Sequence, residues 1–337
     1  MKRSLVLGLS VLLTVSAVAA RAQQEILNAS YDISRELFAD VNKAFVPAYK
    51  ASGGGDVVIK QSHAGSSRQA RSILEGLKAD VVTFNQVGDI QILADSKLVA
   101  KDWSTKFANN SSPFYSVHSI LVRKGNPKGI KDWADLAKPG VSIVQVNPKT
   151  GGNGRYAVLA YYAAGLHASG GDAAKARALT KKILANVVVF ESGGRTATST
   201  FTEREIGDVL VTFEAETLAF ANAPGSTFEV VTPSVSVLSE FPVAVVEKVA
   251  KKRGTEAVSK AYLNFLYTPQ GQEILAKNYY RPRNAEVAAR YSSKLTPVKT
   301  VEVADTFGGW DKATADFFAN GALVDVLLKE IAAERVN

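Results

Sequence analysis

Residues 141–155 read VSIVQVNPKTGGNGR, and this stretch decides the fold class. Val141–Val146 is a short, largely apolar run of the kind that forms a buried strand, and a loop rich in glycine and asparagine follows it. Arg155–Ala168 then carries apolar residues at helical spacing. A strand that turns through glycines into a helix is the repeating unit of α/β sheets.

The same alternation extends along the chain on both sides of this stretch. Strand-like runs lie at 25–29, 56–61, 80–83, 117–124, 187–190 and 209–213, and helical patterns lie at 35–49, 69–77 and 196–206. The last hundred residues are richer in helix, with patterns over 255–267, 269–277 and 313–333. This order predicts an α/β protein with largely parallel sheets.

The length of 337 residues allows two lobes, each with its own core. Chains of this type often pass between their lobes more than once. We place the first crossing near Asn110–Val117 and the return near Val237–Val246. Residues 23–112 with 238–337 are therefore predicted to form lobe 1, and residues 113–237 lobe 2.

The N-terminal segment has the features of a cleaved export signal. Two basic residues open the chain, Leu5–Ala20 is mostly apolar, and Ala20-Arg21-Ala22 supplies the small residues of a signal-peptidase site. Residues 1–22 are therefore predicted to be a signal peptide that is removed, which leaves a soluble mature protein. The apolar stretch is short for a spanning helix.

Composition and motifs exclude several function classes. The chain has no cysteine, and its three histidines, His63, His118 and His167, lie far apart without metal-ligand spacing. The basic residues are scattered, although the net charge is +8, which argues against nucleic acid as a partner. No P-loop or nucleophile motif is present. We predict no metal, no cofactor and no catalytic residue.

One short motif points to a different function. Gly152–Ala157 reads GNGRYA, which matches the weak dinucleotide-binding pattern G-x-G-x-x-A. The acidic residue at the matching distance, Asp172, lies in a glycine-rich turn and not at a strand end. Export also argues against a nicotinamide enzyme, so we interpret these glycines as part of a ligand-binding loop.

Four strand-to-helix junctions carry residues suited to holding an anion. They are 30–35 (SYDISR), 62–69 (SHAGSSRQ), 147–155 (NPKTGGNGR) and 191–196 (ESGGRT). Glycines let the backbone approach a ligand, and a helix start exposes unpaired N–H groups at the positive end of its dipole. Such junctions lie at the carboxyl ends of strands, so we expect the four to converge on one cleft.

Individual side chains in these loops have expected roles. Asp32 is expected to cap the first helix, and Ser66 with Gln69 fits a capping box. An arginine follows each loop, namely Arg35, Arg68, Arg155 and Arg195. These arginines are either solvated helix residues or an outer layer that makes the cleft positive, and the sequence leaves both interpretations open.

At these loops the sequence resembles the periplasmic sulfate- and thiosulfate-binding proteins of ABC transporters for sulfur uptake. The similarity extends from about Ile26 to Asp311. The stretches that carry it include 30–37 (SYDISREL), 61–67 (QSHAGSS), 77–83 (LKADVVT), 122–128 (VRKGNPK), 147–150 (NPKT), 280–283 (YRPR) and 307–310 (FGGW). The resemblance implies a monomeric, two-lobed type II binding protein of the periplasm. It would close on the anion in the inter-lobe cleft and deliver it to membrane permease subunits.

The resemblance also implies the ligand-binding residues, because neutral donors hold the anion in sulfate-binding members. Carried over to this chain, the backbone N–H donors fall on Asp32, Ser66, Gly152, Asn153 and Gly194. A serine hydroxyl of the family falls on Gly151, which has none. Thr150 or a water molecule is expected to replace this donor, and Gly151→Ser is expected to restore it.

An indole N–H of the sulfate-binding branch falls on Phe213. The thiosulfate-binding branch resembles this chain there and also at 84–86 (FNQ) and 110–115 (NSSPFY). A phenyl ring suits a polarizable terminal sulfur better than an oxygen that needs a donor, which favours thiosulfate. The alternatives are Phe213 as strand core, another oxyanion (molybdate or phosphate) or an organic sulfonate as ligand, and an exported α/β enzyme using the same cleft.

Overall fold

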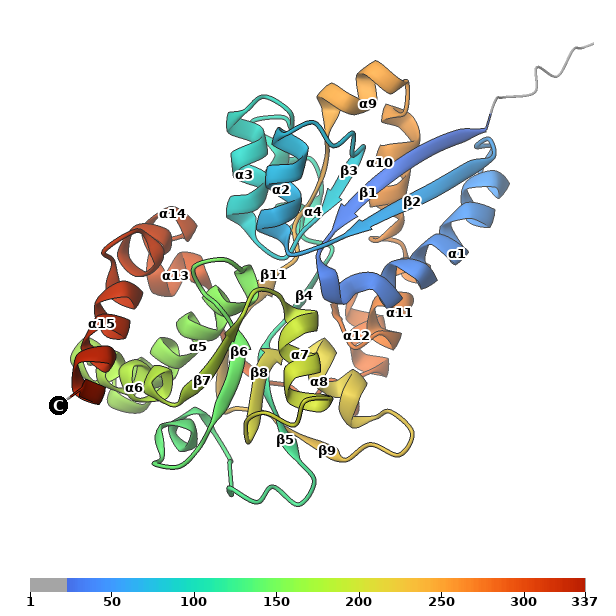
Figure 1. Ribbon diagram of the computed structural model, residues 1–337. Coiled ribbons are helices and arrows are strands. Elements are labelled where there is room, and N and C mark those ends of the chain that lie inside the picture. The colour runs from blue at the N-terminus through green and yellow to red at the C-terminus, as the bar shows by residue number, and fades with distance from the viewer. Residues whose placement is uncertain (1–22, 337) are drawn as a thin grey trace, which may run out of the picture.

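The computed structural model describes residues 23–336, which form two lobes joined by strands that pass between them (Figure 1). One lobe is built on a four-stranded sheet of order β12-β3-β1-β2, and the other on a five-stranded sheet of order β7-β6-β8-β5-β9. The prediction of a two-lobed α/β protein is confirmed. The predicted signal peptide, 1–22, lies outside the described residues.

The first sheet is buried on both faces. Its strands are β1 (Gln24–Ser30), β2 (Val57–His63), β3 (Val81–Thr83) and β12 (Val243–Val245), and the nearby helices are α1 (Arg35–Ala51), α2 (Ser66–Leu74), α3 (Val87–Asp95), α9 (Glu247–Arg253) and α10 (Glu256–Phe265). Val81 and Val82 of β3 point to opposite faces and pack into separate apolar clusters. This double burial explains why two apolar residues follow each other in β3.

The second sheet mixes parallel and antiparallel pairs. It consists of β5 (His118–Arg123), β6 (Ile143–Val146), β7 (Val187–Glu191), β8 (Val209–Phe213) and β9 (Phe228–Val231), with α5 (Gly152–Ser169), α6 (Ala173–Ala185), α7 (Gly194–Thr202) and α8 (Glu214–Ala221) around it. β6 is parallel to β7 and β8, as predicted, whereas β5 is antiparallel to β8 and β9. The prediction of largely parallel sheets is thus right only for the strands followed by crossover helices.

A small sheet of order β11-β4-β13 lies where the chain passes between the large sheets. β4 (Phe114–Ser116) leads into β5, β11 (Ser239–Glu240) leads into β12, and β13 (Arg281–Pro282) pairs with β4. Aromatic rings pack across this region. Phe241 lies 5.1 Å from both Tyr31 and Phe213, measured between ring centroids.

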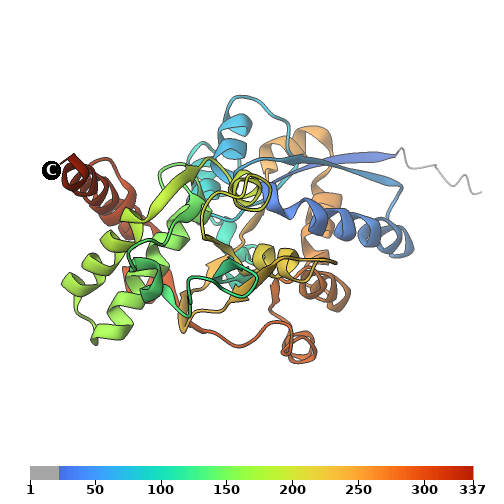
Figure 2. The ribbon, with the colours of Figure 1, turned by 60° about the horizontal axis from the view of Figure 1, so that its bottom comes forward.

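The C-terminal region makes its contacts on both lobes. α11 (Pro269–Lys277) packs against α1, whereas β14 (Lys299–Val301) pairs with β10 (Val235–Val237), and α15 (Leu323–Val336) packs on α6 (Figures 1 and 2). Lys149 and Asp325 form an ion pair at 3.0 Å that adds to this packing. The predicted assignment of all of 238–337 to lobe 1 therefore does not describe α15, which packs on a helix of the other lobe. The apolar face of α15 shows in the sequence, but the helix against which it packs does not.

The remaining elements are short helices in the connections. They are α4 (Ala108–Ser111), α12 (Ala285–Arg290), α13 (Val303–Phe307), α14 (Trp310–Ala313), η1 (Asp32–Ser34), η2 (Trp103–Thr105), η3 (Trp133–Ala137) and η4 (Thr314–Phe318). In the described part of the chain, no helix combines the length and apolar character needed to cross a bilayer.

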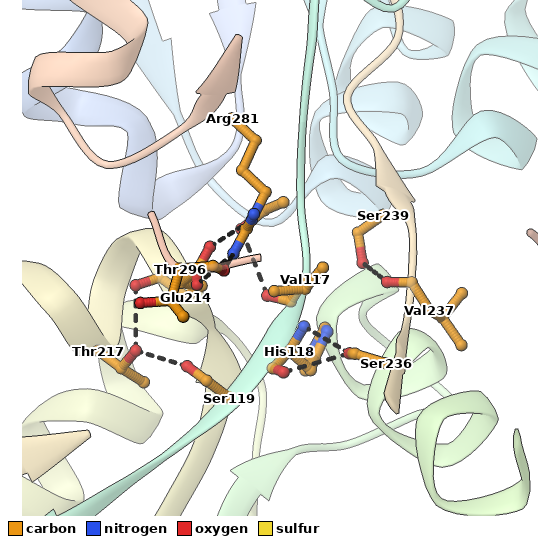
Figure 3. Close-up of polar contacts among 11 residues, drawn as sticks. Val117, His118, Ser119, Glu214, Thr217, Ser236, Val237, Ser239, Arg281 and Thr296 are labelled. Atoms are coloured by element: carbon orange, nitrogen blue, oxygen red, sulfur yellow. Dashed lines mark hydrogen bonds and ion pairs between the residues drawn. The ribbon is translucent and has the colours of Figure 1, made fainter. Parts of the chain in front are cut away.

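A buried ion pair connects the second lobe to the small sheet (Figure 3). Arg281 Nε and Nη2 lie 2.7 Å from the two carboxylate oxygens of Glu214, and Nη2 also donates to the Thr296 carbonyl oxygen at 2.6 Å. The exposed fractions of the two side chains are only 9% and 3%. Glu214 begins α8 directly after β8, so the pair fixes the end of β8 to the connection between the lobes.

We expect Arg281→Met to lower the free energy of unfolding by about 3–5 kcal/mol, because it leaves the Glu214 carboxylate buried without its partner. Arg290→Met is the matched control, since it breaks an exposed ion pair with Glu273 and should cost about 0–1 kcal/mol. Urea unfolding followed by circular dichroism measures both values. Equal losses of unfolding free energy in the two variants would show that the buried ion pair contributes no more to stability than the exposed one.

Candidate anion-binding site

The four loops predicted to hold an anion meet between the two lobes. Across the cleft, the Asp32 carboxylate accepts a hydrogen bond from the Arg195 N–H at 3.0 Å. A Cβ placed on Gly152 would lie 3.0 Å from Asn85 Oδ1, and Asn85 in turn bonds the Ser66 hydroxyl at 2.8 Å. Loops from both lobes thus contact one another.

The five residues predicted to donate backbone N–H groups all occupy the first turn of a helix. Asp32 begins η1, Ser66 begins α2, Gly152 and Asn153 begin α5, and Gly194 begins α7. First-turn N–H groups have no acceptor within their own helix. Among residues 23–336, these five N–H groups have no other hydrogen-bond acceptor either. They form a set of neutral donors with the positive ends of helix dipoles behind them.

The Asp32 side chain has a different role from the predicted one. Tyr31 precedes η1, Ser34 precedes α1, and neither helix is capped by the Asp32 carboxylate. One carboxylate oxygen accepts from the neighbouring Ile33 N at 3.1 Å, and the other reaches the start of α7 in the other lobe, where it accepts from Arg195 N. The prediction of a local cap was wrong because the sequence does not show which helix start lies opposite.

The predicted capping box at Ser66 is also wrong. Gly65 precedes α2 without a side-chain cap, and the Ser66 hydroxyl bonds Asn85. The Gln69 amide donates to the carbonyl oxygens of Ser30 and Ser62 at 3.1 and 2.6 Å. Gln69 therefore holds two of the loops together instead of closing its own helix.

The four arginines divide into two pairs. Arg35 and Arg68 are exposed, as solvated helix residues would be. Arg195 is half-buried, and its Nη2 donates to both carboxylate oxygens of Glu36 of the other lobe at 2.7 and 2.9 Å. Arg155 is also half-buried, and burial lowers its pKa, whereas Asp89 of α3 opposes this shift. Only the second pair faces across the cleft.

Of the positions predicted to affect ligand choice, Phe213 and Gly151 are tightly packed, whereas Thr150 is not. Phe213 is fully buried, with its ring centroid 4.5 Å from that of His118 and 6.1 Å from that of Tyr156. Gly151 precedes α5, and a Cβ there would lie 2.6 Å from Val146 Cγ1. Thr150 is exposed, and its hydroxyl lies 3.4 Å from the Asn147 carbonyl oxygen.

Several polar residues at this site were not predicted as site residues. Asn85 and Gln86 lie in the loop after β3, against Gly152, and the buried Gln86 Oε1 has no hydrogen-bond partner within the described chain. Their position at the carboxyl end of a buried strand was the available signal. His118, Thr198, Thr212 and Glu216 form a buried network behind α5 and α7, which no local pattern indicates.

Metal chemistry has no visible basis at this site. Across residues 23–336, no three His, Asp or Glu side chains are grouped so that they could hold a metal ion. Burial lowers the pKa of His118 to about 4, so this side chain is neutral near pH 7. The site offers backbone donors and carboxamides.

Comparison with known proteins agrees with this geometry. A family model described as "Bacterial extracellular solute-binding protein" matches residues 34–281. The chain belongs to this family. A relative from Escherichia coli K12, named sulfate-binding protein, is 47% identical to this solute-binding protein over 323 residues, covering 96% of this chain and 98% of the relative. Another from the same organism, named thiosulfate-binding protein, is 49% identical over 330 residues, covering 97% and 96%.

The solved structures extend the comparison to three dimensions. The sulfate-binding protein SubI from Mycobacterium tuberculosis H37Rv has a TM-score of 0.79 at 31% identity, covering 88% of this chain and 99% of that one. A ferric binding protein from Campylobacter jejuni, at 17% identity and a TM-score of 0.60, shares the fold. The relatives are binding proteins, and the solute-binding protein described here is a receptor, not an enzyme.

The contact between Gly152 and the loop after β3 predicts that Gly152→Ala weakens anion binding by about tenfold or more. The added methyl group would press on Asn85 and Gln86 and oppose closure of the lobes, at a typical cost of about 1–3 kcal/mol. Calorimetric titration with sulfate measures the effect. Gly88→Ala is the control, because its Cβ would meet only one atom at an ordinary 3.9 Å. Unchanged affinity in Gly152→Ala would show that the cleft does not close this tightly.

Proposed function

We propose that this receptor captures thiosulfate or sulfate in the periplasm and delivers it to the membrane permease of an ABC transporter. The observation that carries the proposal is the set of five first-turn N–H groups that converge from both lobes without acceptors among residues 23–336. Such groups favour a compact anion. The names of the relatives, which cover nearly the whole chain, indicate which anions these are.

The proposed ligand-binding residues follow from this arrangement. Backbone N–H groups of Asp32, Ser66, Gly152, Asn153 and Gly194 hold the anion, and Phe213 forms an apolar wall next to the start of α8. Arg155 and Arg195 lie outside this layer and add positive potential, while Arg35 and Arg68 contribute only at long range. The neutral inner layer is favourable because the dipoles are fixed before the anion arrives.

The organisation of the chain is part of the proposal. Residues 1–22 act as a cleaved export signal, and the mature protein is a monomer. Residues 113–237 form the core of one lobe and 23–112 with the segment after 238 the core of the other. The contacts of α15 with α6 favour a C-terminal segment that returns to the lobe of 113–237.

A panel of anions tests the ligand assignment. Sulfate and thiosulfate should bind, and phosphate should bind about 5- to 100-fold more weakly near neutral pH. Its proton needs an acceptor, which backbone N–H groups do not provide, and an unmet buried donor costs about 1–3 kcal/mol. Competition calorimetry gives the ratios. Phosphate or molybdate binding as tightly as thiosulfate would favour a receptor for another oxyanion.

The packing beside Gly151 supports an effect of Gly151→Ser opposite to the one expected from the sequence. The serine Cβ would lie 2.6 Å from Val146 Cγ1, which is buried in β6, so we expect this substitution to weaken sulfate binding. Val146→Ala removes the obstructing methyl group and should recover binding when combined with Gly151→Ser. The single variants, the double variant and the wild type are titrated together. Tighter binding by Gly151→Ser alone would mean that the loop adapts to the side chain.

A further inference from the structure

A carboxyl group without a cationic partner is buried behind the helix starts of the second lobe. Glu216 lies in the first turn of α8, and the residue is 7% exposed. Its carboxyl oxygens contact the hydroxyl of Thr198, and that of Thr212 at 2.7 Å. No lysine or arginine within residues 23–336 forms an ion pair with it, and Arg195, the nearby cation, pairs with Glu36.

These contacts connect Glu216 to two of the proposed donor residues. On one side, Thr212 Oγ1 accepts a hydrogen bond from Asn153 Nδ2 at 2.8 Å. On the other side, Thr198 Oγ1 donates to the Gly194 carbonyl oxygen at 3.1 Å. Asn153 starts α5 and Gly194 starts α7, so one carboxyl group connects both helix starts of this lobe.

The direction of each hydrogen bond follows from the groups involved. Asn153 donates through Nδ2 to Thr212, so Asn153 Oδ1 accepts from His118 Nε2 at 3.0 Å, and Thr212 donates its own proton to Glu216. The Thr198 hydroxyl has one proton, and it donates this proton to the Gly194 carbonyl oxygen, which can only accept. The contact between Thr198 and Glu216 is then a hydrogen bond only if Glu216 is protonated and donates to the Thr198 oxygen.

We infer that Glu216 is a positioning residue that acts as a neutral carboxylic acid, orienting Asn153 and Gly194 for the anion and weakening binding when it ionises. This inference rests on the proposed function. A carboxylate at this place would lie behind two helix starts, cancel part of their positive potential and repel a dianion.

The charged groups around Glu216 agree with a neutral form. Burial raises its pKa to about 7, and Asp32 raises it further, whereas Thr198, Thr212 and Arg195 oppose the shift. Tyr280 faces the same region, and burial is the main cause of its raised pKa, to which the nearby carboxyl groups, Glu216 among them, add. A bound dianion adds to this repulsion, so Glu216 keeps its proton more strongly in the complex. Affinity should therefore be full below the pKa of the anion-free protein and fall as the pH rises above it.

The test compares Glu216→Gln with Glu216→Leu. A glutamine keeps an N–H donor for Thr198 and an oxygen acceptor for Thr212 but cannot ionise, whereas leucine removes one hydrogen bond from each hydroxyl and leaves only the contacts with Gly194 and Asn153. Glu203→Gln is the control, because it removes one exposed carboxylate next to the end of α7. Each protein is titrated with sulfate and with thiosulfate at about pH 6 and about pH 9, and circular dichroism confirms that it is folded.

Wild type and Glu203→Gln should lose about tenfold or more in affinity between about pH 6 and about pH 9, whereas Glu216→Gln should bind like wild type at the lower pH and change little. Glu216→Leu should bind at least about tenfold more weakly throughout. The inference is overturned if Glu216→Gln binds as weakly as Glu216→Leu, or if it shows the pH dependence of wild type. If neither anion binds to wild type at about pH 6, the proposed function itself is wrong. That result is independent of the variants, so it is distinguishable from a failure of the inference about Glu216.

Discussion

The N–H groups in the first turns of η1, α2, α5 and α7 have no acceptor inside their own helices, and the architecture depends on how they are satisfied. Two of these helices come from each lobe, so the donors form one set only when the lobes face each other. The contact of Asp32 with Arg195 N shows how close this approach is. The two lobes together would bind an anion more tightly than either lobe alone, because each lobe contributes part of the donors. The bound anion would in turn hold the lobes together.

Positive charge is kept one layer away from these donors. Arg195 is paired with Glu36, and Arg155 lies near Asp89, a buried carboxyl whose pKa burial raises to about 6. In each case the arginine belongs to one lobe and the carboxyl group to the other. The two groups therefore come close to each other only when the lobes are closed. In the proposed function, recognition is left to dipoles of fixed direction, which tolerate little change in ligand geometry.

The connection between the lobes is packed as firmly as their cores. Phe241 packs with tilted rings against both Phe213 and Tyr31, and the ion pair of Glu214 with Arg281 anchors the end of β8 beside them. Phe213 therefore belongs both to this packing and to the proposed wall of the site. A substitution of Phe213 would alter the contact with the ligand and the packing between the lobes at the same time. The sequence does not show this double role.

The sequence by itself determined the alternation of strands and helices, the two-lobed class and the loops that carry the donors, because hydrophobic period, glycine and helix-start residues are local signals. The tertiary structure decided what those signals leave open. It directed the Asp32 carboxylate to the start of α7 in the other lobe, set α15 against α6, and brought Glu216 next to Thr198 and His118 next to Asn153. It also placed Val146 Cγ1 2.6 Å from where a Cβ on Gly151 would lie, a close approach that the local sequence does not show. Burial and long-range contacts decide each of these outcomes, and they arise only when distant segments pack together.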